Sequence, residues 1–350
     1  MLKQRVLWWL LAALVVLVAL SVAQRVTHRR AVSRPVQALL SDQTLDLTAI
    51  TRITLGWGPD STAVVIERLP DHWVVRTSYS YPASQQRIDD LLRNLGDLRG
   101  EFRSDKAEVL ADYGLAGDGA VAITVFGQDF QPQLRLLVGR KPLGSVGEFV
   151  RRRDSSAVYL SSVSLLSPLG LWNGPARPKS SHFVDLQAYK GERNDIESLV
   201  IDDGGKITEL VKVFPPPPPA PAVADTGQAT PPPAQDRSIY EWRLKRPREA
   251  AALKTKVDAI LNSASTVRAI DVADPDGDPL AYGLWKARRK LDLGLRDGTS
   301  VTLFFGAARA EAADQPAGIY MRTSLDNSVW VVRESVVNAI FVKPEELRTP

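Results

Sequence analysis

The sequence RIDDLLRNLGDLRG, residues 87–100, determines how the rest of the chain is interpreted, because the same pattern returns 169 residues later. In the first segment the apolar residues recur at the spacing of one helix face: Ile88, Leu91, Leu92, Leu95 and Leu98. In the second segment the corresponding positions are again apolar: Val257, Ile260, Leu261, Ala264 and Val267. We therefore expect an amphipathic helix in each half of a chain that is built from one repeated unit.

Other landmarks recur in the same order with small changes of offset. Trp73 recurs as Trp242, and Tyr113-Gly114-Leu115 recurs as Tyr282-Gly283-Leu284, both at an offset of 169 residues. Gly139 recurs as Gly306 at an offset of 167, and Arg151 recurs as Arg322 at an offset of 171. A duplicated domain produces such an order. Most of these residues are of types that serve folding rather than catalysis, and we expect the two tryptophans to lie in the core.

A proline-rich stretch of 23 residues, FPPPPPAPAVADTGQATPPPAQD, occupies positions 214–236. Upstream of it the offset between the copies falls to 146, so the stretch is an insertion within the second copy. It takes the place of the first copy's short turn at residues 69–72, and we expect a stiff, exposed loop. Docking into an aromatic-lined groove of a partner is the alternative. The boundary between the copies is expected at residues 173–181.

The alternation of apolar residues predicts an α+β fold of mostly antiparallel sheet with one packed helix in each copy. The first repeat spans residues 45–172 and the second spans residues 183–345. In the first repeat the helix is expected at 84–98 and strands near 50–55, 63–68, 73–77, 121–126, 134–139, 148–153 and 157–160. In the second repeat strands are expected near 291–295, 301–305, 318–323 and 329–333.

Residues 6–23, VLWWLLAALVVLVALSVA, contain a single polar residue. As a helix they would span about 27 Å, which matches the hydrocarbon core of a bilayer. We expect residues 1–34 to be a membrane anchor with basic flanks, inserted in the lipid bilayer through residues 6–23. The alternative is a cleavable signal peptide, since Ser21-Val22-Ala23 has the small-x-small pattern of a cleavage site.

The net charge of +4 belongs to the N-terminal segment, because residues 1–34 hold six basic and no acidic side chains, which leaves the body at −2. A near-neutral body excludes nucleic acid as an expected partner. We expect a single-pass protein of the bacterial inner membrane with its C-terminal domains in the periplasm. A cytoplasm-facing scaffold is the alternative, because positive charge flanks both ends of the segment.

Catalytic and metal-binding patterns are missing from the sequence, so we predict a non-enzymatic protein with no cofactor. There is no cysteine, and none of the three histidines has a partner at ligand spacing. The sharpest acidic cluster holds Asp274, Asp276 and Asp278, which resemble the first half of a calcium loop. The twelfth position of that loop is Trp285 instead of glutamate, and we therefore favour a solvated acidic turn.

The densest basic patch of the body consists of Arg140, Lys141, Arg151 and Arg153. On an alternating strand Arg151 and Arg153 would share one face. This arrangement fits a surface for an anionic partner, and equally a sheet edge that charge protects from aggregation.

The order of Tyr113-Gly114-Leu115, a strand that ends at Gly139, the turn Gly144 to Gly147, and Phe149-Val150-Arg151 resembles the DUF4340 family, a domain of unknown function. The resemblance covers about residues 45–345, as two tandem copies. It implies an extracytoplasmic, membrane-anchored, non-enzymatic protein, similar to accessory components of ABC-type export or gliding-motility systems. It supplies no catalytic residues.

Two function hypotheses follow. The first is an envelope interaction module that binds partner proteins, among them subunits of an ABC-type transport complex. The second is a periplasmic glycan- or lipid-binding protein, or a hydrolase, with a cleft between the copies.

Overall fold

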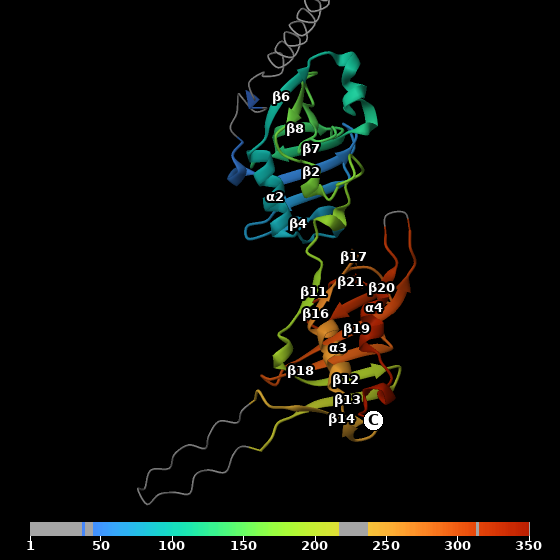
Figure 1. Ribbon diagram of the computed structural model, residues 1–350. Coiled ribbons are helices and arrows are strands. Elements are labelled where there is room, and N and C mark those ends of the chain that lie inside the picture. The colour runs from blue at the N-terminus through green and yellow to red at the C-terminus, as the bar shows by residue number, and fades with distance from the viewer. Residues whose placement is uncertain (1–36, 39–44, 217–236, 313–314, 350) are drawn as a thin grey trace, which may run out of the picture. The chain divides into compact units, whose positions relative to one another are not determined.

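The computed structural model describes residues 37–38, 45–216, 237–312 and 315–349 (Figure 1). They form two compact units that divide between Pro178 and Lys179, except that His72–Ser84 groups with the second unit. The expected membrane segment at 6–23 lies outside the described residues. Within the described residues, no helix is long and apolar enough to cross a membrane.

The first unit is an antiparallel sheet with one α-helix. Its strands are β1 (Gln37–Ala38), β2 (Arg52–Trp57), β3 (Val64–Arg68), β6 (Arg99–Ser104), β7 (Val121–Phe126), β8 (Pro132–Val138), β9 (Phe149–Arg152) and β10 (Val158–Ser161). They lie in the order β1-β6-β10-β9-β8-β7-β2-β3. The 3-10 helices are η1 (Leu47–Ala49), η3 (Ala107–Tyr113), η4 (Gly117–Gly119) and η5 (Ser167–Leu169).

The second unit contains two antiparallel sheets. The larger has the order β15-β14-β13-β12-β18-β19-β20-β21-β17, and the smaller pairs β11 with β16. The strands are β11 (Gln187–Lys190), β12 (Ile196–Asp203), β13 (Lys206–Val213), β14 (Glu241–Arg246), β15 (Ala250–Ala251), β16 (Thr266–Arg268), β17 (Asp271–Ala273), β18 (Arg289–Leu295), β19 (Ser300–Arg309), β20 (Gly318–Thr323) and β21 (Val329–Val332). The 3-10 helices are η2 (Arg76–Ser78), η6 (Ser180–His182), η7 (Arg193–Asp195) and η8 (Pro344–Leu347).

The segment His72–Ser84, which the sequence places in the first repeat, forms the hairpin of β4 (Trp73–Val75) and β5 (Tyr81–Pro82). Its contacts explain the grouping with the second unit. The Ser84 amide donates to the Phe183 carbonyl at 2.7 Å, and the Tyr81 hydroxyl accepts from the Val329 amide at 2.6 Å.

The amphipathic pattern gives the expected helix in each unit. Helix α2 (Gln85–Gly96) lies across the sheet of the first unit (Figure 1) and buries Ile88, Leu91 and Leu95 completely. Helix α3 (Lys254–Ser265) buries Val257, Ile260, Leu261 and Ala264. The expectation of one helix per repeat is wrong for the second unit, because α4 (Glu334–Ile340) packs against α3 with Val337 and Ile340 buried.

The two larger sheets share strand order and register. The order β6-β10-β9-β8-β7-β2-β3 has its counterpart in β17-β21-β20-β19-β18-β12-β13. Leu137 lies opposite Arg151 in the first unit, as Phe304 lies opposite Arg322 in the second. Likewise Val150 lies opposite Tyr159, as Met321 lies opposite Trp330. These partners differ by 167 residues on β8 and β19 and by 171 on the following strands, the offsets found in the sequence.

Buried tryptophans and required glycines explain several repeated landmarks. Trp73 and Trp242 are both 4% exposed, which confirms that they lie in the core. A Cβ on Gly139 would lie 2.3 Å from the Tyr113 carbonyl oxygen, and a Cβ on Gly306 would lie 2.1 Å from that of Tyr282. No side chain fits at such distances, so glycine is required after the strand in both units.

Most of the proline-rich stretch, residues 217–236, lies outside the described residues. The strands on either side of it, β13 and β14, are antiparallel neighbours in one sheet, with Val213 opposite Glu241. The stretch therefore connects adjacent strands of the second unit.

Candidate functional site

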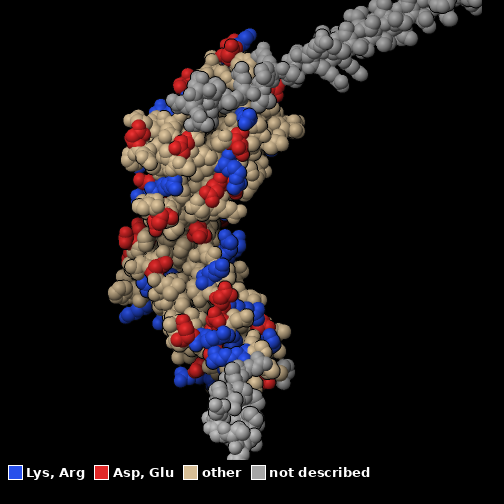
Figure 2. Space-filling view, turned by 90° about the vertical axis from the view of Figure 1, so that its left-hand side faces the viewer, with Lys and Arg blue, Asp and Glu red and all other residues tan. Residues whose placement is uncertain are grey.

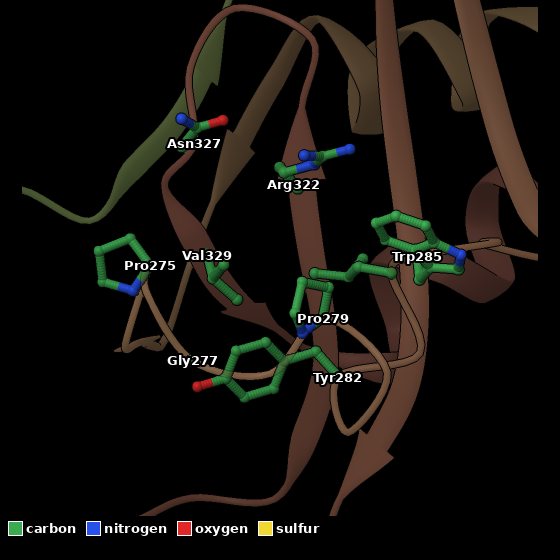
Figure 3. Close-up of a pocket in the computed structure, with 9 residues that line it drawn as sticks. Pro275, Gly277, Pro279, Tyr282, Trp285, Arg322, Asn327 and Val329 are labelled. Atoms are coloured by element: carbon green, nitrogen blue, oxygen red, sulfur yellow. The ribbon is translucent and has the colours of Figure 1, made fainter.

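A pocket of about 350 Å³ opens on the second unit, where the loop between β17 and β18 lies beside β20 and β21 (Figure 3). Its lining consists of Pro275, Gly277, Pro279, Tyr282, Leu284, Trp285, Arg322, Asn327 and Val329. The repeated Tyr282-Gly283-Leu284 turn holds this loop against the sheet, because the Ala307 amide donates to the Tyr282 carbonyl at 2.8 Å. A landmark that sequence reasoning assigned to folding thus also positions a cavity.

The walls of the pocket are mainly apolar and its rim exposes large hydrophobic side chains. Trp285 lines the pocket and is 67% exposed. Leu280 and Leu325 belong to the same two loops and are 70% and 63% exposed. Exposed apolar groups around a cavity mark binding surfaces more often than isolated surface leucines do.

The polar lining comes from Tyr282, Arg322 and Asn327. The Tyr282 hydroxyl points toward Pro275 and Gly277 (Figure 3), and a Cβ on Gly277 would lie 2.3 Å from that oxygen. Burial is the main cause that raises the pKa of Tyr282, and the nearby Asp274 carboxylate adds to it. The phenol is therefore neutral at physiological pH and is able to donate a hydrogen bond.

Arg322 brings a positive charge to the pocket without a carboxylate partner within ion-pair distance in the described part of the chain. Its guanidinium lies 5.2 Å from the centroid of the Phe304 ring. Its Nε is buried and has no hydrogen-bond partner among the described residues. The Asp326 carboxylate in the adjacent turn accepts instead from the Ser328 amide at 2.9 Å.

Both units have a buried cluster under the repeated turn. In the first unit Leu115, Ala120, Ala122, Leu137 and Val158 form it, and Leu110, Tyr113 and Phe149 pack against it. In the second unit Ala273, Leu284 and Val329 form the corresponding cluster, with Tyr282, Phe304 and Tyr320 packed against it. Adding the copy offset of 169 to Leu110 gives Pro279, which is exposed at the pocket. The same offset carries Ala116 to Trp285. The pocket lies beside the buried cluster of the second unit, at positions where the residues of the two units differ.

The equivalent arginines differ in the same way. In the first unit Nη1 of Arg151 donates to the carbonyls of Arg152, Arg153 and Ser155 at 3.2, 3.0 and 2.9 Å. Burial lowers the pKa of Arg151. The Nε of Arg151 is also without a hydrogen-bond partner in the described residues, so the hydrogen bonding of the two arginines differs at the terminal nitrogens. Arg151 fastens a turn, whereas the terminal nitrogens of Arg322 make no such bond within the described residues.

The residues of the predicted basic patch make separate local contacts in the structure. Arg140 donates to the Ala111 carbonyl at 2.6 Å, Arg153 pairs with Asp60, and Lys141 is exposed. Arg153 lies beyond the end of β9, so the alternation that would align it with Arg151 does not extend to it. Lys and Arg are interspersed with Asp and Glu over the face shown in Figure 2.

The acidic turn uses its carboxylates to hold the backbone. Asp274 accepts from the Asp276 amide at 3.0 Å, and Asp278 accepts from the Leu280 amide at 2.9 Å. Among the described residues, no group of three or more His, Cys, Asp or Glu side chains is placed to hold a metal ion. This turn forms one wall of the pocket.

The structure contains two buried polar arrangements that the sequence did not predict. Asp271 pairs with Arg309 at 2.8 Å, and both side chains are almost fully buried. Glu148 is 1% exposed, and its carboxylate accepts from the Ser164 hydroxyl at 2.7 Å and the Leu165 amide at 2.8 Å. Both serve packing rather than a surface site.

A second depression of about 470 Å³ lies elsewhere on the second unit, lined by Asp203, Gly204, Gly283, Arg288, Arg289, Phe305, Gly306 and Ala307. Its two arginines are exposed, Arg289 donates to Asp203 at 3.1 Å, and its one large apolar residue, Phe305, is buried. Because it lacks an exposed apolar rim, we regard the pocket beside Arg322 as the candidate site.

The comparison with known proteins identifies one domain. A family model described as "Domain of unknown function (DUF4340)" matches residues 73–214. No curated protein and no solved structure gives a significant match. The expected resemblance is thus confirmed for one copy, and the matched segment runs from β4 to the end of β13, across the division between the two units.

Proposed function

We propose that this chain is a membrane-anchored, non-enzymatic interaction module of the bacterial envelope, and that its second unit carries the recognition surface. In this proposal residues 6–23 span the inner membrane, the two units face the periplasm, and the partner is a subunit of an ABC-type transport complex. The second unit is interpreted as a diverged second copy of the DUF4340 domain. The shared strand order and register support this duplication.

The observation that carries the proposal is the pocket with its apolar rim. Trp285, Leu280 and Leu325 are each more than 60% exposed on the two loops around it. Large exposed aromatic and aliphatic groups are the residues that anchor protein partners when they become buried. At the equivalent loop positions the first unit has Leu110 and Ala116 where the second unit has Pro279 and Trp285, so the two surfaces differ.

Affinity capture from detergent-solubilised membranes tests this function. We expect the wild-type protein to capture a permease or ATPase subunit of an ABC-type transporter, and Trp285→Asp to abolish the capture. Trp172→Asp is the matched control, because Trp172 is 73% exposed in the first unit and its replacement is expected to leave capture intact. Capture that is absent from the wild type, or equal in both variants, would contradict the proposal.

Membrane topology is tested separately. A reporter enzyme that is active only in the periplasm, fused after Pro350, is expected to be active. Activity only of a cytoplasmic reporter at the same position would instead support the scaffold that faces the cytoplasm.

A periplasmic lipid- or glycan-binding function is the second candidate. It is favoured by one specific observation, the presence of an arginine without a carboxylate partner in a pocket with apolar walls. The hydrolase alternative has no such support from the described residues.

A further inference from the structure

We propose that the pocket of the second unit binds a small amphiphile that carries one anionic group. The anion lies against Arg322, and the apolar part lies against Pro279, Leu284 and Trp285. This inference rests on the second candidate function, in which the second unit binds a ligand directly. A fatty carboxylate and an alkyl phosphate derived from a lipid share the required chemistry.

The first step of the argument is the charge of Arg322. This half-buried guanidinium stacks on Phe304 at 5.2 Å but has no hydrogen bond or ion pair with any described residue. Its counterpart Arg151 donates to three backbone carbonyls at the same place in the first unit. A guanidinium that is partly removed from water is stabilised by an anion, and its planar fork binds carboxylate and phosphate oxygens in pairs.

The second step is that nearby acids do not supply that anion. Four carboxylates adjoin the lining residues in sequence, those of Asp274, Asp276, Asp278 and Asp326, and none of them forms an ion pair with Arg322. Asp274, Asp278 and Asp326 each accept a backbone amide of their own turn, from Asp276 at 3.0 Å, Leu280 at 2.9 Å and Ser328 at 2.9 Å. The side-chain donors that line the pocket are Arg322, the Asn327 amide, the Tyr282 hydroxyl and the Trp285 indole.

The third step is the shape and polarity of the cavity. A volume of about 350 Å³ is at the lower end of the range for ligand sites, roughly 300 to 1,000 Å³. Its remaining walls are carbon-rich, with two prolines, a leucine, a valine and the Trp285 ring. A small ion such as free phosphate would leave these walls exposed, whereas a short aliphatic chain beside the anion would cover them.

The fourth step is that the loop is held in place. The Leu284 amide donates to the Pro279 carbonyl at 2.9 Å, and the Tyr282 amide donates to the Asp278 carbonyl at 3.3 Å. A loop fixed by its own hydrogen bonds loses less conformational entropy when a ligand binds.

The test is calorimetric titration of the full chain in nanodiscs of zwitterionic lipid, with empty nanodiscs as the baseline. The probes are hexyl phosphate, hexanoate, hexanol and inorganic phosphate. We expect hexyl phosphate or hexanoate to bind, and the stronger of the two to identify the anion. Hexanol and inorganic phosphate are each expected to bind about tenfold more weakly or not at all, because each lacks one half of the required chemistry.

Variants assign the site. Arg322→Gln is expected to lower the affinity for the anionic probe about tenfold, and Trp285→Ala to lower it severalfold. Arg288→Gln in the second depression is the matched control and is expected to have no effect. Trp285 is largely exposed, so that variant remains informative even if Arg322→Gln fails to fold.

Equal binding of hexanol and hexyl phosphate would overturn the proposal, as would binding that neither the Arg322 nor the Trp285 variant reduces. Absence of binding by both anionic probes would overturn it as well. These outcomes are independent of the capture experiment, since a protein that captures a transporter subunit but binds no amphiphile refutes only the ligand proposal.

Discussion

Arg151 and Arg322 show how the surroundings of one residue type set its role. The two arginines occupy equivalent strand positions, since each lies opposite its partner on the preceding strand, Leu137 or Phe304. The first guanidinium donates to backbone carbonyls, and the second stacks on an aromatic ring beside a cavity. Sequence comparison of the copies reveals the shared arginine but not this difference, which depends on the turns that follow.

Glu148 gives a prediction at the scale of one buried side chain. Glu148→Ala is expected to lower the free energy of unfolding of the first unit by about 1 to 3 kcal/mol, because the Ser164 hydroxyl and the Leu165 amide would lose their acceptor. Denaturant unfolding followed by hydrogen exchange in the first unit measures the loss. The exposed Glu108→Ala serves as the control, and an equal effect of both changes would contradict this role of Glu148.

Tyr81 gives a prediction that depends on pH. Burial raises the pKa of Tyr81 above its ordinary value near 10, so the folded state keeps the phenol protonated where an unfolded tyrosine ionises. Its contribution to stability is therefore present below about pH 10 and is lost progressively as the pH rises above that value.

Tyr81→Phe is expected to lower stability at neutral pH by about 1 to 3 kcal/mol, since the Val329 amide loses the hydroxyl that accepts its hydrogen bond at 2.6 Å. It is also expected to make the decline in stability between about pH 9 and 11 less steep. Denaturation at several pH values checks both effects. A variant with the same alkaline slope as the wild type would show that other groups cause the decline.

At the scale of elements, the two amphipathic helices are expected to stabilise their own units. Leu91 in α2 and Ile260 in α3 are equivalent by the copy offset, and both are fully buried. Leu91→Ala is expected to destabilise the first unit and Ile260→Ala the second, each by about 2 to 5 kcal/mol, because each leaves a cavity. Hydrogen exchange measured by mass spectrometry distinguishes the units. Loss of protection in the opposite unit alone would contradict this assignment, and Arg93→Ala is the exposed control.

The elements that the sequence predicts are those with a clear apolar period. Helix α2 and strands such as β7 and β20 follow from alternation or helical spacing. Strand β6 was not predicted, because in RGEFRS only Phe102 is a large apolar residue, and its pairing with β10 determines its conformation. Helix α4 was not predicted either, since its seven residues follow β21 almost directly and its stability comes from packing against α3.

At the scale of the whole chain, the internal repeat carries most of what was predictable. It gave the two-part organisation, the buried tryptophans and the required glycines, because these properties follow from features that both copies share. The candidate site was not predictable in that way, since it depends on positions where the copies differ, such as Leu110 and Pro279 or Ala116 and Trp285. A search for diverged positions between the copies is the signal that would have found it.

Duplication makes a final prediction about the proline-rich insertion. If the second unit is a copy of the first, the short connection of the first copy should also close the second. We expect that replacing residues 214–240 with the sequence of the first copy's turn, Leu69-Pro70-Asp71-His72, preserves the fold, because Val213 and Glu241 already lie opposite each other. Closing the shorter loop costs less conformational entropy, so the free energy of unfolding should stay the same or rise by about 1 to 2 kcal/mol. The midpoint of thermal unfolding should change in the same direction. Circular dichroism and thermal unfolding measure this. Loss of the second unit's structure would show that the insertion is required for folding, and would count against its assignment as an exposed loop.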